Sequence, residues 1–249
     1  MVNRHKYLNT ARTYRNLCRK TPEEISYQVV LEHSDLYIIS TRDLKSLVLD
    51  RLSIVRREIK GYIILHPEFG SSLVPVAVED SSPGIIKAMA EAAELFGVGP
   101  MAAVAGAISE DIALHASVVC QDIIVENGGD IFLYSARDRV VGLLPHPEEP
   151  ACLGVKILKD ETPCAICSSS ATIGHSLSLG RGDLVTVRAG SGAVADAAAT
   201  ALCNMLHSRK SMTALKKMRP GLEKNGVTGV LAQMGEELIV WGNMELTMV

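Results

Sequence analysis

Short runs of β-branched and apolar residues alternate along the chain with longer segments of helical periodicity. Residues 26–33 and 35–40 are two short runs split by a turn, which predicts a β-hairpin. Residues 41–60 place apolar side chains at helical spacing, with Thr41 as the expected N-cap. Further helices are expected at residues 82–96, opened by Ser82 and Pro83, at residues 100–115, opened by Pro100, and at the Ala-rich residues 191–207.

The remaining apolar runs are short and predict strands. Residues 62–65 and 73–78 flank the expected loop 66–72. Paired strands are expected at 117–126 with 131–135, and at 226–233 with 236–241, and single strands at 139–144, 154–158, 165–168 and 183–188.

The order of these elements favours an α+β fold. Strand pairs alternate with single or paired helices, whereas parallel βαβ winding needs one strand for each helix. We therefore expect a single domain over residues 1–249, with an antiparallel sheet and helices on one face. Residues 1–20 are expected to form a basic, flexible arm, and the Pro-rich residues 145–150 a loop.

Composition is that of a folded protein. Hydrophobic residues make up 47% of the 249 residues, and the mean hydropathy is +0.19, which excludes a mainly disordered chain. Neither a signal peptide nor a membrane span is evident, so a cytoplasmic protein without membrane contact is expected. The six cysteines are then expected to be reduced. Aromatic residues, at 4%, are too scarce for a base-stacking nucleic-acid platform.

The formal net charge of −3 is unevenly distributed. Residues 1–20 carry six Lys or Arg and no acid, and residues 206–224 carry six against Glu223 alone, so the rest of the chain is acidic. The simplest explanation of the two basic segments is that their side chains form ordinary solvated surface. The alternative is electrostatic capture of an anionic ligand such as a phosphate, whereas nucleic acid would be repelled by the acidic body.

The stretch Asn127-Gly128-Gly129-Asp130 is the first candidate site. Two adjacent glycines permit positive φ and leave backbone N–H groups uncovered, so a planar ring or a phosphate can approach. Asp130 would then bond to a ligand N–H or hydroxyl. The alternative is an ordinary hairpin turn, because Asn-Gly is the commonest hairpin signal.

The start of the Ala-rich helix is the second candidate. Asp196 and Thr200 are four residues apart and share a face, and a carboxylate with a hydroxyl suits Mg²⁺. The N–H groups of a helix start also favour phosphate. The alternative is a surface Asp beside a Thr on a helix whose alanines allow tight packing. Residues 99–106, which include Gly99 and Met101, similarly form either a helix start for a flat ligand or a close helix contact.

Cys164 and Cys167 form the only C-x-x-C. They would be either redox or persulfide-carrying thiols, or two half-buried cysteines on a strand. Cys152 and His175 complete a zinc site only if the usual ligand spacing is stretched. The hydroxyl-rich residues 168–176, with His175 and Ser176, form either a polar loop that faces a ligand or a simple turn.

Together these stretches resemble the ApbE superfamily, whose namesakes are FAD:protein FMN transferases. Asn127-Gly128-Gly129-Asp130-Ile131 is similar to the flavin-site motif of that family, and residues 195–202 are similar to its metal-binding helix. The runs 98–106, 125–130 and 174–176 look like an uncharacterised ApbE-like branch of anaerobic archaea and bacteria. His175 is not followed by the Asp-Pro-x-Thr-Gly ending of the transferases.

The resemblance implies a T-fold-like (ApbE-like) antiparallel sheet backed by helices, Mg²⁺ held by Asp196 and Thr200, and an FAD- or FMN-like ligand. The implied catalytic residues are Asp196, Thr200 and His175, and the implied cofactor-binding residues are Asn127, Gly128, Gly129, Asp130, Gly99, Met101 and Ser176.

Two functions stay open at this point. The first is an Mg²⁺-dependent transferase or hydrolase that acts on a flavin- or nucleotide-like diphosphate. The second is a protein without flavin that carries sulfur or binds a ligand in homocysteine synthesis, through Cys167 or Cys164. Because T-fold proteins commonly assemble, a homo-oligomer is also expected.

Overall fold

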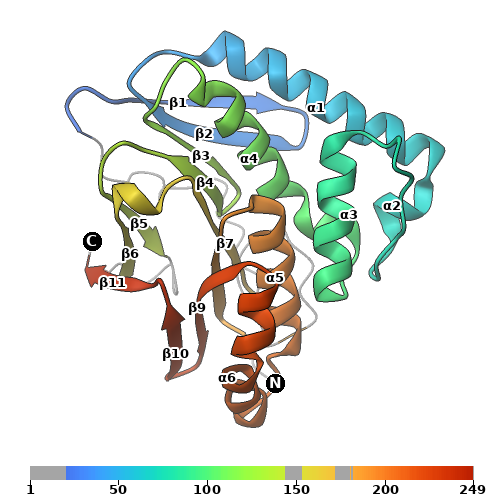
Figure 1. Ribbon diagram of the computed structural model, residues 1–249, viewed down its shortest axis with the longest axis vertical. Helices are drawn as coiled ribbons and strands as arrows, with labels where there is room; N and C mark the ends of the chain where they lie inside the picture. The colour runs from blue at the N-terminus through green and yellow to red at the C-terminus, as the bar shows by residue number, and fades with distance from the viewer. Residues whose placement is uncertain (1–20, 144–152, 172–179, 181, 249) are drawn as a thin grey trace, which may run out of the picture.

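The computed structural model describes residues 21–143, 153–171, 180 and 182–248 (Figure 1). Its centre is an eight-stranded sheet in the spatial order β1-β2-β3-β4-β7-β8-β9-β10, and every pair of neighbours is antiparallel. The strands are β1 (Ile25–Leu31), β2 (Ser34–Ser40), β3 (Ile123–Asn127), β4 (Asp130–Tyr134), β7 (Cys164–Ser169), β8 (Leu184–Ala189), β9 (Val227–Met234) and β10 (Glu237–Gly242). The expected α+β fold class is confirmed.

Helices cover one face of this sheet, as expected (Figure 1). They are α1 (Lys45–Leu65), α2 (Pro67–Ser71), α3 (Gly84–Phe96), α4 (Val104–Ser117) and α5 (Gly192–Met205), with the 3₁₀ turn η2 (Pro100–Ala103) before α4. α6 (Arg209–Lys224) packs against β9, and a second 3₁₀ turn, η3 (Lys159–Glu161), precedes β7. The fully buried alanines of α5 let that helix lie close to both α4 and the sheet.

A second, three-stranded sheet covers the opposite face. It consists of β5 (Arg139–Leu143), β6 (Leu153–Ile157) and β11 (Glu245–Met248), in the order β11-β6-β5. Successive side chains of a strand point to opposite faces, so Ile38 enters the core under the helices and Ile39 enters the core under the small sheet. The protein therefore has three layers, of which the sequence predicted two.

Several predicted elements differ from the structure. Residues 62–65 are the last turn of α1 rather than a strand, because Tyr62 stacks on His66 at 4.3 Å and meets Phe69 edge-on at 5.1 Å. Residues 73–78 have no regular structure. Thr41 does not cap α1, because that helix begins only at Lys45. The hydroxyl of Thr41 lies 3.3 Å from the sulfur of Cys120 instead.

The chain between α4 and β3 also differs from the prediction. Ser117 ends α4, and the strand expected from residue 117 begins only at Ile123. Within the described ranges, no single helix combines the length and apolarity of a membrane span; α3 and the segment Pro100–Ser117 pass that test only jointly, and they are bent by 104°.

α4 and α5 touch through their backbones. A Cβ atom added to Gly106 would overlap the carbonyl oxygen of Gly192, and a Cβ added to Gly192 would overlap the carbonyl oxygen of Gly106. Both glycines lie in the first turn of their helices. The crossing therefore requires glycine on both sides.

We expect Gly106→Ala and Gly192→Ala each to lower the free energy of unfolding by about 1–3 kcal/mol or more, because backbone atoms cannot move aside as a flexible side chain can. Urea unfolding measures the change. Gly61→Ala is the matched control, since Gly61 lies inside α1 with nothing within 4 Å of its Cβ position, and the change should stabilise by about 0.5–1 kcal/mol. Equal effects at the three positions would contradict the proposed close contact.

Candidate functional site

Across this glycine contact, α4 and α5 each supply a carboxylate from their second turn to the first turn of the other helix. Oδ2 of Asp196, on α5, accepts a hydrogen bond of 2.9 Å from the backbone N–H of Gly106 on α4. Oε2 of Glu110, on α4, accepts from the backbone N–H of Gly192 at 2.7 Å and from the Ser191 hydroxyl at 3.0 Å. Each helix thus supplies the acceptor for a backbone N–H that the other helix leaves without an intrahelical partner. A negative charge near a helix N-terminus is also attracted by the positive end of the helix dipole, so this arrangement is stabilising.

The β3–β4 hairpin ends in the predicted turn. Gly128 and Gly129 have φ of 73° and 111°, and positive φ at both positions is the requirement of a type I′ turn. The N–H of Gly129 donates to Oε1 of Glu126 at 2.9 Å. A Cβ at either glycine would meet nothing within 4 Å, so the tip of the turn is open to an approaching group.

The first turn of α4 attaches this hairpin to the helix pair. The Ser109 hydroxyl lies 3.0 Å from the carbonyl oxygens of both Ala105 and Asp130, and the Asn127 amide donates to Ala105 O at 3.4 Å. Because Gly106 of the same turn donates to Asp196, one helical turn contacts both predicted motifs. The structure therefore brings Asn127–Asp130 and Asp196 together.

Asp130 and Asp196 are both buried and close enough to interact through their charges. Burial raises the pKa of the Asp130 carboxyl well above its usual range, and the charge of Asp196 raises it further. Backbone N–H of Ser168, at 3.2 Å, and the Cys167 thiol donate to Asp130. Burial also raises the pKa of Asp196 to about 7, although the N–H groups of Gly106 and Ala105 oppose that shift. Ion pairs among the described side chains do not include either carboxylate.

These residues fit a Mg²⁺ ion as a partial ligand set. Two buried carboxylates whose charges disfavour each other create a place where a cation stabilises the ionised forms. Thr200 lies half-buried one turn beyond Asp196, on the same side of α5. Within the described part of the chain, no group of three or more His, Cys, Asp or Glu side chains is arranged to hold a metal. Waters, carbonyl oxygens or ligand phosphates would complete the six oxygen ligands.

The start of α5 does not offer the free N–H groups that the sequence suggested for a phosphate. Gly192 N–H donates to Glu110, and Val194 N–H donates to the Ser191 hydroxyl at 3.5 Å. An incoming phosphate would also meet the negative charge of Glu110. Two of the N–H groups at this helix start are therefore already engaged within the protein, and direct phosphate binding there stays a prediction.

The expected surface position of Asp196 is also wrong. The Asp196 side chain is buried and accepts a hydrogen bond from the first turn of α4. Replacement by Ala would therefore lower the stability of the fold as well as weaken ligand binding. No local pattern indicates this role, because Gly106 lies ninety residues away in the sequence. Glu110 was missed for the same reason, and Gly106 followed by Glu110 one helical turn later is the signal that would have indicated it.

Of the other predicted ligand-binding residues, two pack within the protein and two lie outside the described residues. Gly99 is buried against the backbone of Ser72, so its missing side chain admits that chain segment rather than a ligand. Met101 is half-buried and packs against the main core, in a 3₁₀ turn that contacts α5. His175 and Ser176 lie outside the described residues.

Cys164 and Cys167 lie on one strand, as the second alternative expected, but both are buried rather than half-buried. The two side chains point to opposite faces of β7, since Cys167 lies in the core under the helices and Cys164 in the core under the small sheet. Burial raises the pKa of both thiols, and for Cys167 the charges of Asp130 and Asp196 act in the same direction. A reactive thiolate is therefore disfavoured at both positions. Cys152, proposed as a further zinc ligand, lies outside the described residues.

The metal-free protein should lose stability as the pH rises from about 4 to above 7. A carboxyl group with a higher pKa in the folded than in the unfolded state binds more protons when folded, so its contribution is present below its usual pKa and is lost toward the folded pKa of about 7. Asp196→Asn keeps an acceptor for Gly106 N–H without the charge and should flatten this dependence. Asp196→Ala should cost about 1–3 kcal/mol at pH 5, because it leaves a buried donor without its acceptor.

Urea unfolding at pH 5 and pH 8 in EDTA measures these differences. Asp50→Asn is the matched control, because Asp50 is exposed on α1. If the Asp196→Asn variant and the wild type lost the same stability between the two pH values, the assignment of the shift to Asp196 would be wrong.

Comparison with known proteins places this geometry in a family. A family model described as AbpE bacteria matches residues 15–235. A UPF0280 protein of Methanocaldococcus jannaschii is 45% identical over 157 residues, which are 62% of this chain and 64% of that protein, just under two thirds of its length. A UPF0280 protein of Methanothrix thermoacetophila is 36% identical over 217 residues, covering 85% of this chain and 90% of that protein.

Solved structures show the same fold. The flavin transferase ApbE from Vibrio cholerae aligns with 89% of this chain and 97% of its own at a TM-score of 0.51 and 15% identity. The ApbE protein from Thermotoga maritima aligns with 88% of this chain and 97% of its own at a TM-score of 0.59 and 12% identity. These identities are low, so this likeness concerns the fold alone. The match over residues 15–235 shows that the chain belongs to the ApbE-like family described as AbpE bacteria.

Proposed function

We propose that this protein binds a flavin diphosphate such as FAD together with Mg²⁺, where the β3–β4 turn meets the first turns of α4 and α5, and that it acts there as a Mg²⁺-dependent transferase. The observation that carries the proposal is the pair of buried carboxylates, Asp130 and Asp196, that the fold brings together from two separate motifs. The flavin transferase activity named for the Vibrio cholerae relative supports the ligand class.

The turn glycines suit the ring of the ligand. Gly128 is exposed, and the space above both glycines is empty to 4 Å, so a flat ring can approach the backbone. Asp130, whose ionised form a bound cation would stabilise, can accept a hydrogen bond from a ring N–H or a ligand hydroxyl. The ring end would therefore lie over the hairpin.

The diphosphate end depends on the metal. Asp196 and Thr200 would hold Mg²⁺, whose charge would stabilise the negative charge on the phosphate oxygens. Because the N–H groups of Gly192 and Val194 are already satisfied, this neutralisation cannot come from the helix start. Glu110 would keep the start of α5, and with it Asp196, in place without touching the ligand.

FAD should bind to the purified protein only with Mg²⁺, because the buried carboxylates repel a diphosphate unless a cation lies between them. Titration calorimetry with FAD in MgCl₂ and in EDTA tests this. Asp196→Asn should weaken Mg²⁺-dependent binding by about tenfold or more, while Asp50→Asn should leave it unchanged. A tenfold loss corresponds to about 1.4 kcal/mol, which is close to the lower end of the usual worth of a hydrogen bond to a charged group, about 1.5–3 kcal/mol.

Two results would overturn the proposal. One is FAD binding that is equally tight in EDTA and in MgCl₂. The other is the absence of binding by a protein that circular dichroism shows to be folded. Release of AMP from bound FAD, followed by chromatography, then distinguishes a transferase or hydrolase from a protein that binds only.

A further inference from the structure

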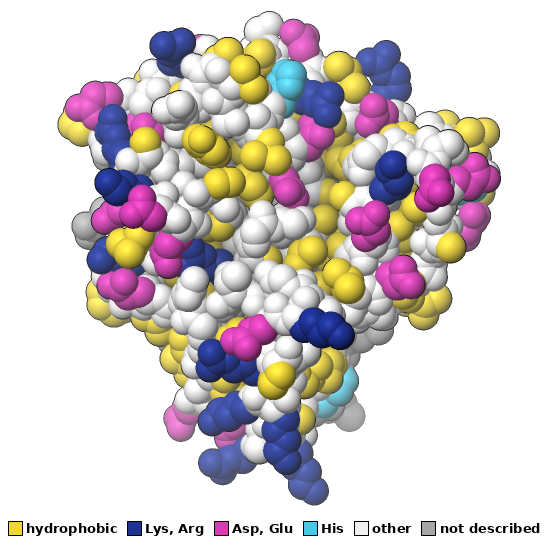
Figure 2. Space-filling view, viewed as in Figure 1, with side chains coloured by type: hydrophobic (Ala, Val, Ile, Leu, Met, Phe, Trp, Pro, Cys, Tyr) yellow, Lys and Arg dark blue, Asp and Glu magenta, His cyan; other side chains and the backbone are white. Residues whose placement is uncertain are grey.

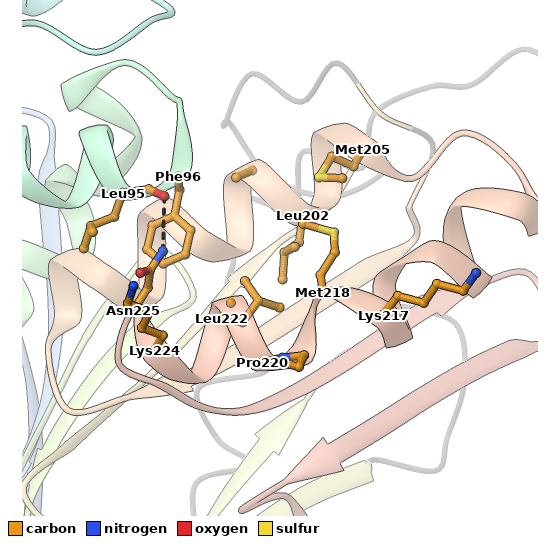
Figure 3. Close-up of a pocket in the computed structure, with 12 residues that line it drawn as sticks. Leu95, Phe96, Leu202, Met205, Lys217, Met218, Pro220, Leu222, Lys224 and Asn225 are labelled. Atoms are coloured by element: carbon orange, nitrogen blue, oxygen red, sulfur yellow. Dashed lines mark hydrogen bonds between the residues drawn. The ribbon is translucent and has the colours of Figure 1, made fainter.

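A cavity of about 480 Å³ opens between α6, the C-terminal end of α3 and the second half of α5 (Figure 3). Its volume falls within the range of small-molecule sites, which is about 300–1,000 Å³. Its floor and walls are mainly apolar, formed by Leu95, Phe96, Leu202, Met205, Met218 and Leu222. The two methionines have unbranched, flexible side chains that adapt to ligands of different shape.

The edge of the cavity carries positive charge. Lys217 and Lys224 line it and are seven residues apart on α6, so they share one side of the helix about 10 Å apart along its axis. Neither forms an ion pair with any described residue, whereas Arg209 and Arg219 of the same helix pair with Glu237 at 2.7 Å and Glu223 at 2.8 Å. Figure 2 shows Lys and Arg side chains gathered at the end of the molecule that α6 occupies.

This cavity is separate from the carboxylate site. At 100° per residue, Ala201 and Met205 lie on the side of α5 away from Asp196 and Thr200. Met205 is also nine residues beyond Asp196, about 13 Å along the helix. A ligand in the cavity would therefore not contact Asp196.

We propose that this cavity binds an amphipathic organic anion, with an apolar acyl or aryl body on the floor and an acidic head group at Lys217 or Lys224, which lie at opposite ends of the cavity (Figure 3). An apolar floor beside two ammonium groups that form no ion pair with the described residues is complementary to such a molecule in both parts. A free phosphate would leave the floor exposed to water. The side-chain amide of Asn225 donates one of its two N–H groups to the carbonyl oxygen of Leu95 at 3.4 Å (Figure 3).

The fluorescent anion 8-anilinonaphthalene-1-sulfonate is a suitable probe, because it combines an aryl body with one sulfonate. We expect saturable binding to the folded protein, displacement by decanoate and weaker displacement by decanol, which lacks the charge. Lys217→Gln with Lys224→Gln should weaken probe binding by about fivefold or more, because the change removes the ammonium groups that would pair with the sulfonate. FAD with Mg²⁺ should not displace the probe.

The matched control is Lys210→Gln with Lys216→Gln, which removes the same charge from α6 outside the cavity. Ala201→Phe, at a half-buried lining position, should fill the cavity and abolish binding whatever the charge. Three results would each overturn the proposal. The two double lysine variants could weaken probe binding equally, decanol could displace the probe as well as decanoate does, or Ala201→Phe could leave probe binding unchanged. An acidic amphipathic peptide that displaces the probe when decanoate does not would assign the cavity to a protein partner and overturn it as well.

Discussion

The contact between Gly106 and Gly192 is the constraint on which the rest of the site depends. Where two helices approach until their backbones touch, no side chain can fill the space between their first turns, and the N–H groups there have no room for water. The carboxylates of Asp196 and Glu110 accept hydrogen bonds from these N–H groups, each from the backbone of the opposite helix. The same pair of bonds fixes how α4 and α5 are rotated, and therefore where Asp196 and Thr200 point.

This arrangement also concentrates negative charge in an apolar region. Glu110, Asp130 and Asp196 all act on the buried Cys167 thiol, which is itself held between β7 and the start of α5. The backbone donors of Gly106 and Ser168 reduce the cost of burying these carboxylates, but donors without formal charge do not neutralise them. Asn or Ser would also accept hydrogen bonds from these backbone N–H groups, without bringing a charge that must be buried. The retained charge is therefore a physical reason to consider a cation at this position.

Much of this fold follows from local patterns, and its exceptions have physical causes. The glycine turn at Gly128 and Gly129 and the helix that begins after Ser191 depend on a few adjacent residues, and the sequence predicts both. α6 was read only as a basic segment, because its buried residues Met212, Leu215 and Leu222 are separated by lysines and by the helix-breaking pair Pro220-Gly221. The burial of Asp196 depends on tertiary contacts between distant segments, which periodicity does not encode. The separation of Cys164 from Cys167, by contrast, follows from the alternation of side chains along β7, because the two residues are three positions apart.

The three-stranded layer has a consequence for the order in which the protein assembles during synthesis. β11 is the last described strand to leave the ribosome, yet it pairs with β6, which is translated some ninety residues earlier. Until Met244 and the strand after it emerge, β6 has a free edge, and the apolar residues around Leu231 and Ile166 on that face of the large sheet lack part of their cover. The part of the helical face over β1 to β8 can close as soon as α5 is made, and the part at β9 closes once α6, β9 and β10 have followed. The two faces of one sheet are thus completed at different times, and the second face stays exposed to other nascent chains for longer.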